Sequence, residues 1–244
     1  MQQYDKEIYE YYLGQKFDVD EFLKGLDRKR YHQQLDYYWS KHLGTEKEAA
    51  ILDLGCGWGD FLLFLKGKGF QNLYGIDANS QSVEVANKLG LNQVVLGDLF
   101  EILDQFISEG RTFKVISAFN LLEHIEKNSA LILLKKVSTL LCDGGKLLLE
   151  IPNANSNFGA RTRYWDFTHK VSFTPTSVDQ ILKVTGYKNI EFQEKIAVPK
   201  NLTGKIRRLL WKLIKLKTHF YLLVEQGNIG IDIFSQDMHV IATK

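Results

Sequence analysis

The sequence predicts an α/β fold in which helices cover both faces of a mostly parallel sheet. Short apolar runs alternate with amphipathic segments of helical spacing from residue 49 onward, and a glycine-rich turn follows the first run. This alternation is typical of parallel sheets, because each parallel connection crosses back over one face. The 244 residues, 45% of them hydrophobic, are enough for one large domain with a buried core.

Seven strands are predicted from the apolar runs, with helices between them. Six strands lie at residues 50–54, 72–77, 93–98, 113–120, 146–152 and 238–243. Residues 178–193 predict a helix followed by the seventh strand. Other helices are predicted over residues 60–69, 80–89, 129–141 and 201–217, and we expect Ser80 to cap the second of these. Residues 153–174 carry little periodicity, and such long irregular segments are usually functional.

The chain is predicted to be a single domain with three parts. Residues 1–48 form a helical segment, with helical spacing around Leu26, Tyr31, Leu35 and Tyr38. Residues 49–152 form the half that follows the glycine-rich turn. Residues 153–244 supply the long irregular loop, a basic amphipathic helix and the final strands.

Composition excludes several function classes. The net charge of +2 gives no argument for nucleic-acid binding. The two cysteines fit neither a disulfide framework nor a zinc site. The chain begins without a secretory signal pattern, and no apolar run is long enough to span a bilayer. We therefore expect a cytoplasmic protein.

The stretch DLGCGWGD, from Asp53 to Asp60, is the first candidate binding site. Its three alternating glycines let a ligand lie against the backbone at the end of the first strand. A dinucleotide fingerprint would need a third glycine where Asp60 stands. A carboxylate at a helix start would repel a pyrophosphate. The turn therefore indicates a ligand without phosphate and with some positive charge.

The stretch ILDLGCGWG resembles the glycine-rich motif of class I S-adenosylmethionine-dependent methyltransferases, and the resemblance covers nearly all of the chain from residue 49. It implies a Rossmann-like seven-stranded sheet, S-adenosylmethionine as cofactor, and a helical lid over residues 1–48. Asp77 would bind the ribose hydroxyls and Asp98 the adenine. The alternative is that these strand-end aspartates only cap helices. The implied donor-binding residues are Asp53, Gly55, Gly57, Gly59, Asp77, Ala78, Asp98, Leu99, Asn120 and Gln34.

The acceptor side is predicted from two further resemblances. AFNLLEHIEK resembles the motif after the fourth strand of this superfamily, where Glu123 and His124 would reach the acceptor. DFTHKVSFTPTS resembles a subgroup associated with bacterial capsule and O-antigen synthesis. An alcohol acceptor must lose a proton, so Glu123, His124 and His169 are the catalytic candidates.

The same three residues are candidate metal ligands. They resemble the Glu-x-x-Glu-His metal site of plant small-RNA 2′-O-methyltransferases and some ubiquinone-pathway O-methyltransferases, although Asn120 replaces the first glutamate. A divalent Mg or Mn ion would fit oxygen and imidazole ligands. The alternative is a Glu–His hydrogen bond that orients the base.

These features favour O-methylation of a nucleotide-linked sugar or glycan. Arg161 and Arg163 match phosphate or carboxylate groups, and Tyr164 and Trp165 could stack on rings. The alternatives are a small-molecule O- or N-methyltransferase of quinone or secondary metabolism, and a non-catalytic protein that only binds S-adenosylmethionine.

The basic amphipathic helix is the last candidate surface. Its apolar residues share one face, and residues 201–217 contain no acid. The preferred interpretation is docking on its own domain or on a second subunit of a homo-oligomer. Peripheral contact of residues 202–217 with an anionic membrane is the alternative.

Overall fold

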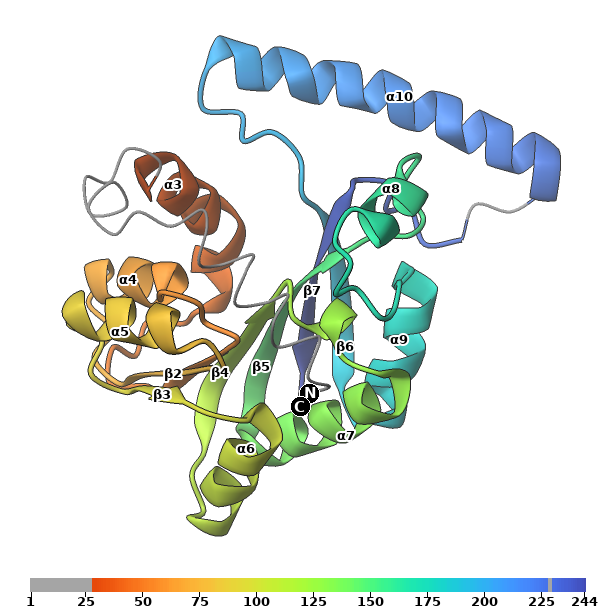
Figure 1. The fold of residues 1–244 in the computed structure, drawn as a ribbon. Coiled ribbons are helices and arrows are strands. Elements are labelled where there is room, and N and C mark those ends of the chain that lie inside the picture. Colours follow the sequence, from red (N-terminus) through yellow and green to blue (C-terminus); the bar gives the residue numbers. More distant parts are fainter. Residues whose placement is uncertain (1–27, 228–229) are drawn as a thin grey trace.

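A seven-stranded sheet runs through the computed structural model, which describes residues 28–227 and 230–244 (Figure 1). The strand order is β3-β2-β1-β4-β5-β7-β6, and only β7 runs antiparallel to its neighbours. This confirms the predicted fold class. The strands are β1 Ile51–Leu54, β2 Leu73–Asp77, β3 Val94–Leu96, β4 Phe113–Phe119, β5 Leu141–Pro152, β6 Lys188–Glu194 and β7 Asp237–Thr243.

The described helices cover both faces of this sheet. Because successive strand residues point to opposite faces, Ile51 joins one hydrophobic core while Leu52 and Leu54 join the other. Helices α3, α4 and α5 enclose the first core, and α6, α7 and α9 enclose the second. The α-helices are α3 Arg28–Trp39, α4 Asp60–Gly67, α5 Ser80–Lys88, α6 Leu99–Ser108, α7 Lys127–Leu140, α8 Gly159–Tyr164, α9 Pro175–Val184 and α10 Leu202–Gln226.

Several element ends differ from the sequence-based expectations. Asn79, not Ser80, caps α5, because its side chain accepts a hydrogen bond from the Ser82 amide at 2.8 Å. Residues 159–164 form the short helix α8 inside the segment where no periodicity was visible. Helix α10 continues past the predicted end at residue 217 and stops at Gly227, whose φ of 66° is left-handed.

Helix α3 is the described part of the predicted lid, since residues 1–27, including Leu26, lie outside the described residues. Its Leu35 and Tyr38 are buried against the first core, and Tyr31 packs beside them. The Tyr38 hydroxyl accepts a hydrogen bond from the Ile196 amide at 2.9 Å. This bond ties α3 to the segment that follows β6 and holds the helix over the carboxyl edge of the sheet (Figure 1).

Candidate functional site

The glycine-rich turn after β1 needs glycine at each of its three positions. Gly55, Gly57 and Gly59 have φ values of 64°, 53° and 86°, a region that other residues adopt with strain. The Gly57 amide donates to Asp77 Oδ2 at 2.7 Å, which fastens the turn to the end of β2. A Cβ on Gly59 would lie 2.2 Å from Leu91. The turn is therefore a backbone cradle fixed by its own contacts, exposed at Gly55 and half-buried at Gly57.

Two carboxylates flank this cradle. Asp53 is buried on β1, where its Oδ1 accepts a hydrogen bond from Ser117 Oγ at 2.7 Å. Burial raises the pKa of Asp53 to about 7, although the Ser117 bond opposes the shift. Burial also raises the pKa of Asp77, against hydrogen bonds from the amides of Asn79 and Gly57. A cationic ligand would stabilise the ionised form of both groups.

Other predicted donor-side residues have simpler surroundings. Asp98 is exposed and caps α6, accepting from the amides of Phe100 and Glu101 at 2.8 and 3.3 Å. Capping was the alternative reading of this residue, and it is present; whether Asp98 also contacts a ligand stays a prediction. Ala78 is exposed, and Leu99 and Gln34 are half-buried.

Tyr31, together with Arg30 and Gln34, was expected to face the donor or the acceptor if its helix covers the site. Burial raises the pKa of its hydroxyl, and the charges of Glu150 and Asp53 add to the effect. The Tyr31 ring therefore lies near the carboxylates beside the cradle. Arg30, which was predicted to face the same site, is exposed.

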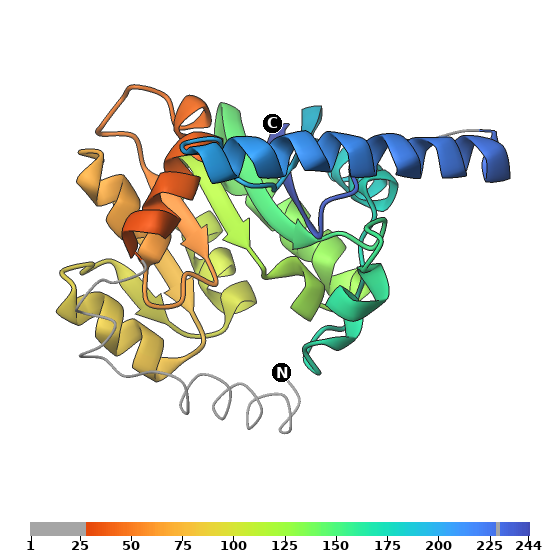
Figure 2. The same cartoon turned by 90° about the horizontal axis from the view of Figure 1, so that it is seen from above.

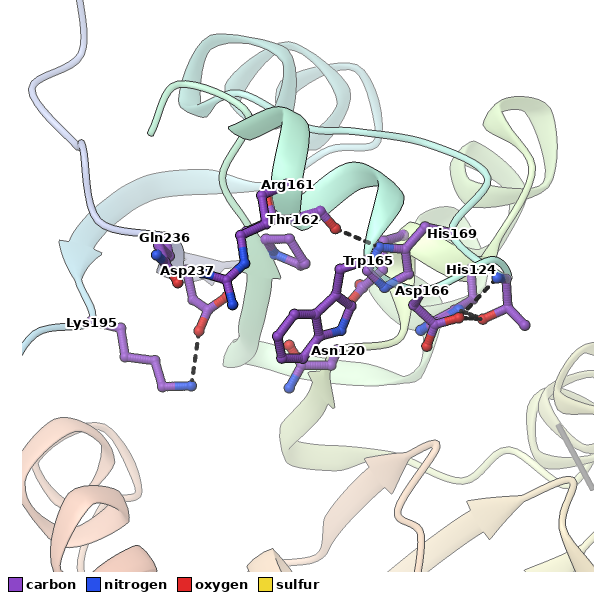
Figure 3. Close-up of a pocket in the computed structure, with 13 residues that line it drawn as sticks. Asn120, His124, Arg161, Thr162, Trp165, Asp166, His169, Lys195, Gln236 and Asp237 are labelled. Atoms are coloured by element: carbon purple, nitrogen blue, oxygen red, sulfur yellow. Dashed lines mark hydrogen bonds and ion pairs between the residues drawn. The ribbon is translucent and has the colours of Figure 1, made fainter. Parts of the chain in front are cut away.

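A cavity of about 430 Å³ lies next to the cradle, at the carboxyl ends of β4 and β5 and under α8 (Figure 3). Asn120, which follows β4 with a left-handed φ of 49°, connects the two regions. Its amide nitrogen Nδ2 donates to Glu150 Oε1 at 3.2 Å. The lining residues are Asn120, Glu123, His124, Pro152, Arg161, Thr162, Trp165, Asp166, Thr168, His169, Lys195, Gln236 and Asp237.

Glu123, His124 and His169 converge on one wall of this cavity. One potential ligand atom from each lies within 4.8 Å of the other two. The Glu123 carbonyl accepts hydrogen bonds from the amides of Lys170 and Val171 at 2.8 and 3.1 Å. These bonds hold the loop that carries His169 against the short 3-10 helix Leu122–His124. The loop therefore brings His169 beside His124, which lies 45 positions earlier in the sequence.

The Glu123 carboxylate is the most unusual group in the cluster. The residue is 2% exposed, and neither carboxylate oxygen has a hydrogen-bond partner among the described residues. Burial raises its pKa to about 8. Buried polar atoms are almost always paired, so two carboxylate oxygens without a protein partner suit a protonated carboxyl group or a bound cation.

Each imidazole is oriented by a hydrogen bond at its Nδ1 (Figure 3). His169 Nδ1 lies 2.9 Å from the Thr162 carbonyl, so this nitrogen carries the proton and Nε2 has the lone pair. His124 Nδ1 lies 2.8 Å from Thr168 Oγ1, and that hydroxyl donates to Asp166 Oδ1 at 2.7 Å. Burial and the neighbouring His169 lower the pKa of His124 to about 4. His124 is therefore neutral at physiological pH.

The opposite wall holds a charged network that sequence reasoning missed. Lys195 Nζ donates to Glu150 Oε1 at 2.7 Å and to Asp237 Oδ2 at 3.1 Å, and buried His239 bonds Glu150 Oε2 at 2.8 Å. Although burial opposes it, these bonds lower the pKa of Glu150 to about 2. Glu150 is the one charged residue in the apolar run LLLEIP, and a buried carboxylate requires charged or hydrogen-bonding partners. This feature of the sequence could have indicated the network.

The predicted acceptor residues of α8 divide into two groups. Arg161 and Trp165 line the cavity, as expected for contacts with an acceptor. Arg163 instead donates to the main-chain carbonyls of His169 and Lys170. Arg163 therefore holds the loop around His169 in place, whereas it was predicted to bind the acceptor. Tyr164 is 79% exposed and does not line the cavity.

Comparisons with known proteins identify the family and the fold. A family model described as a methyltransferase domain matches residues 24–192. A S-adenosylmethionine-dependent methyltransferase from Archaeoglobus fulgidus is 22% identical with a TM-score of 0.64, over 89% of this chain and 94% of that one. One from Mesorhizobium loti is 15% identical with a TM-score of 0.57, over 86% and 97%.

A plantazolicin methyltransferase, solved with a substrate analogue and S-adenosylhomocysteine, is 17% identical with a TM-score of 0.56, over 98% of this chain and 89% of that one. At these identities the solved structures show a shared fold. No curated protein matches the sequence.

Proposed function

The chain belongs to the methyltransferase-domain family, and we propose that it transfers the methyl group of S-adenosylmethionine to a hydroxyl of a nucleotide-linked sugar or glycan. The observation that carries this proposal is the convergence of Glu123, His124 and His169 on the wall of a cavity beside the glycine cradle. An alcohol must lose a proton on methylation, so it needs groups of this kind more than an amine does.

The donor would lie across the cradle. Its positive charge suits the two carboxylates, Asp53 beneath the turn and Asp77 at the end of β2. Asp77 already accepts hydrogen bonds from two backbone amides. The remaining lone pairs of its carboxylate can accept hydrogen bonds from the ribose hydroxyls, as predicted. Methyl transfer from a sulfonium is an in-line displacement, so holding donor and acceptor in line is most of the catalytic task.

The acceptor would occupy the cavity between α8 and β7. Most of the residues that line it carry side-chain groups able to form hydrogen bonds, and the carbon portions of these side chains can pack on the faces of a sugar ring. Asp237, Gln236 and Asn120 can bind hydroxyl groups. Arg161 can bind a phosphate, and Trp165 is exposed for stacking on a ring. A nucleotide-linked sugar presents all three kinds of group.

The acceptor hydroxyl would lose its proton at the histidine wall. As its oxygen forms a bond to the methyl carbon, the carbon–sulfur bond breaks and the proton leaves the oxygen. His169 is held with the lone pair of Nε2 ready to accept that proton, because Nδ1 donates to the Thr162 carbonyl. His124 remains neutral and packs edge-on against His169, with ring centroids 4.8 Å apart.

The residues present also fit a divalent cation. Two buried carboxylate oxygens without partners and two imidazoles form a mixed oxygen and nitrogen set. The Thr162 carbonyl and the Thr168–Asp166 pair hold the rings from behind, as is usual for metal-bound histidines. Bound Mg²⁺ or Mn²⁺ would lower the pKa of the acceptor hydroxyl and orient it.

A screen of nucleotide-linked sugars with labelled S-adenosylmethionine tests the function. We expect transfer of the labelled methyl to a sugar hydroxyl, lost in His169→Gln. Lys127→Gln, an exposed change on α7, is the matched control. Transfer to an amine that survives His169→Gln would favour the N-methyltransferase alternative. Full activity in strong chelator would reject the cation and leave His169 as the base.

A further inference from the structure

Helix α10 is a long rod on the outside of the molecule. Its 25 residues extend about 38 Å, across the carboxyl edge of the sheet and past the end of the body (Figures 1 and 2). Asn201 caps its start by accepting from the Gly204 amide at 2.8 Å. A Cβ on Gly204 would lie 2.2 Å from the Val198 carbonyl oxygen, so this glycine lets the first turn of the helix pack on the segment that leads into it.

The side of α10 that contacts the body is mainly polar. Arg208 donates to the Tyr37 hydroxyl at 2.6 Å, and Trp211 Nε1 donates to Glu194 Oε2 at 2.9 Å. Lys215 pairs with Asp232 at 2.8 Å and Glu194 at 3.4 Å, and His219 pairs with Asp232. The spacing of three and four residues places these groups on one face of the helix.

The opposite side of α10 is apolar and exposed. This arrangement contradicts the expectation that the apolar face docks on the chain's own domain. The polar contacts of Arg208, Trp211 and Lys215 turn the opposite side of the helix toward the body, so the apolar side faces outward. The side chains of this outer face are between 47% and 72% exposed. The outer face consists of Leu202, Ile206, Leu209, Leu210, Leu213, Leu216, Phe220 and Val224.

Exposed cations flank the outer face. Lys205, Arg207, Lys212 and Lys217 are all exposed, and α10 contains no acid before Glu225. Lys217 lies among the apolar residues, four positions after Leu213, and the other three cations lie to the sides. A surface that combines apolar side chains with cations in this way matches an anionic bilayer, where acyl chains lie beneath negative headgroups. None of the described helices is long and apolar enough to cross a membrane.

We propose that the outer face of α10 binds the surface of an anionic lipid bilayer, with the helix lying in the plane of the headgroups. Charge favours this partner over a second copy of the chain. Two copies meeting through this face would bring lysines and arginines against each other, without acids to pair them over most of the helix. An anionic lipid surface attracts the same cations.

The test is co-sedimentation of the full chain with vesicles of 30% phosphatidylglycerol and 70% phosphatidylcholine, and with vesicles of phosphatidylcholine alone. We expect binding to the first and little to the second. Lys205→Gln/Lys212→Gln should weaken it about 25-fold, at about fivefold per cation. Leu209→Gln/Leu213→Gln should weaken it at least about tenfold.

Matched controls change equally exposed residues elsewhere. Ile132→Gln/Val184→Gln removes two apolar side chains of similar exposure, and Lys127→Gln/Lys135→Gln removes two cations from α7. Both should bind like the wild type. Absence of binding to the phosphatidylglycerol vesicles, or equal binding by all variants, would overturn the proposal. A second contradicting result would be a wild-type protein that does not bind the vesicles but forms a dimer in light scattering. In that case Leu209→Gln/Leu213→Gln would dissociate the dimer.

Discussion

Replacing Asp53 by Asn should stabilise the ligand-free protein at neutral pH and weaken donor binding. Burial raises the pKa of Asp53 from its ordinary value of 3.8 to about 7. In the unfolded chain the carboxyl ionises near pH 4, whereas in the folded chain it keeps its proton until about pH 7. Folding therefore binds a proton between these values, and wild-type stability falls as the pH rises through that window.

The magnitude follows from the pKa difference. A difference of about 3 corresponds to about 4 kcal/mol, which is an upper bound on the cost of burying the ionised carboxylate. Asn has similar shape and keeps an oxygen to accept the Ser117 bond of 2.7 Å. Because a chain of this size gains about 2 °C per kcal/mol, Asp53→Asn should raise the melting temperature by up to about 8 °C at pH 8.

Differential scanning fluorimetry at pH 4.5 and pH 8 measures this effect. The stabilisation by Asp53→Asn should be only about 1 kcal/mol at pH 4.5, roughly a quarter of its value at pH 8, while exposed Asp143→Asn changes neither melting temperature. Calorimetry should show at least about tenfold weaker binding of S-adenosylmethionine to Asp53→Asn at pH 8. A variant that melts lower than the wild type at pH 8, or that binds the donor equally well, would refute this account of Asp53.

Three other changes give separable results. Glu123→Gln should reduce Mn²⁺ affinity in a calorimetric titration by at least about tenfold, and heat of binding unchanged from wild type would count against the cation site. Gly59→Ala should lower the free energy of unfolding in urea by about 2–4 kcal/mol, because its Cβ would lie 2.2 Å from Leu91. The control Gly69→Ala, at a glycine with a φ of 88° and open space around it, should lower it by only about 1 kcal/mol. Equal losses in the two variants would contradict the contact with Leu91. Glu150→Gln should cost about 3 kcal/mol at pH 7, since it leaves Lys195 and His239 with a weaker partner, and unaltered stability there would contradict the network's importance.

The glycine cradle could be predicted because its cause is local. Three glycines in alternation after an apolar run require a backbone that turns through left-handed φ, whatever packs around it. The mostly parallel sheet with helices on both faces followed from the alternation of strands and helices, whereas the strand order came from the structure. The approach of His169 to Glu123 and His124 could be anticipated because all three follow strand ends at one edge of the sheet.

The remainder of the site depends on tertiary packing. Lys195 reaches Glu150 only because β6 and β7 lie beside β5, and no spacing in the sequence encodes that neighbourhood. Arg163 could not be told from Arg161 by residue type, since the direction of each depends on where α8 begins. The amphipathic pattern of residues 201–217 predicted the helix correctly but not which face meets the body. The partners of Trp211 and Lys215 on other segments decide that orientation.

We infer that the donor and the acceptor meet at Asn120, between the cradle and the cavity. A crystal structure with bound S-adenosylhomocysteine would locate both sites. We expect the ribose at Asp77 and the sulfur facing the cavity wall of Glu123, His124 and His169. Density for the compound with its sulfur turned away from that wall, or an empty cradle at saturating ligand, would contradict it.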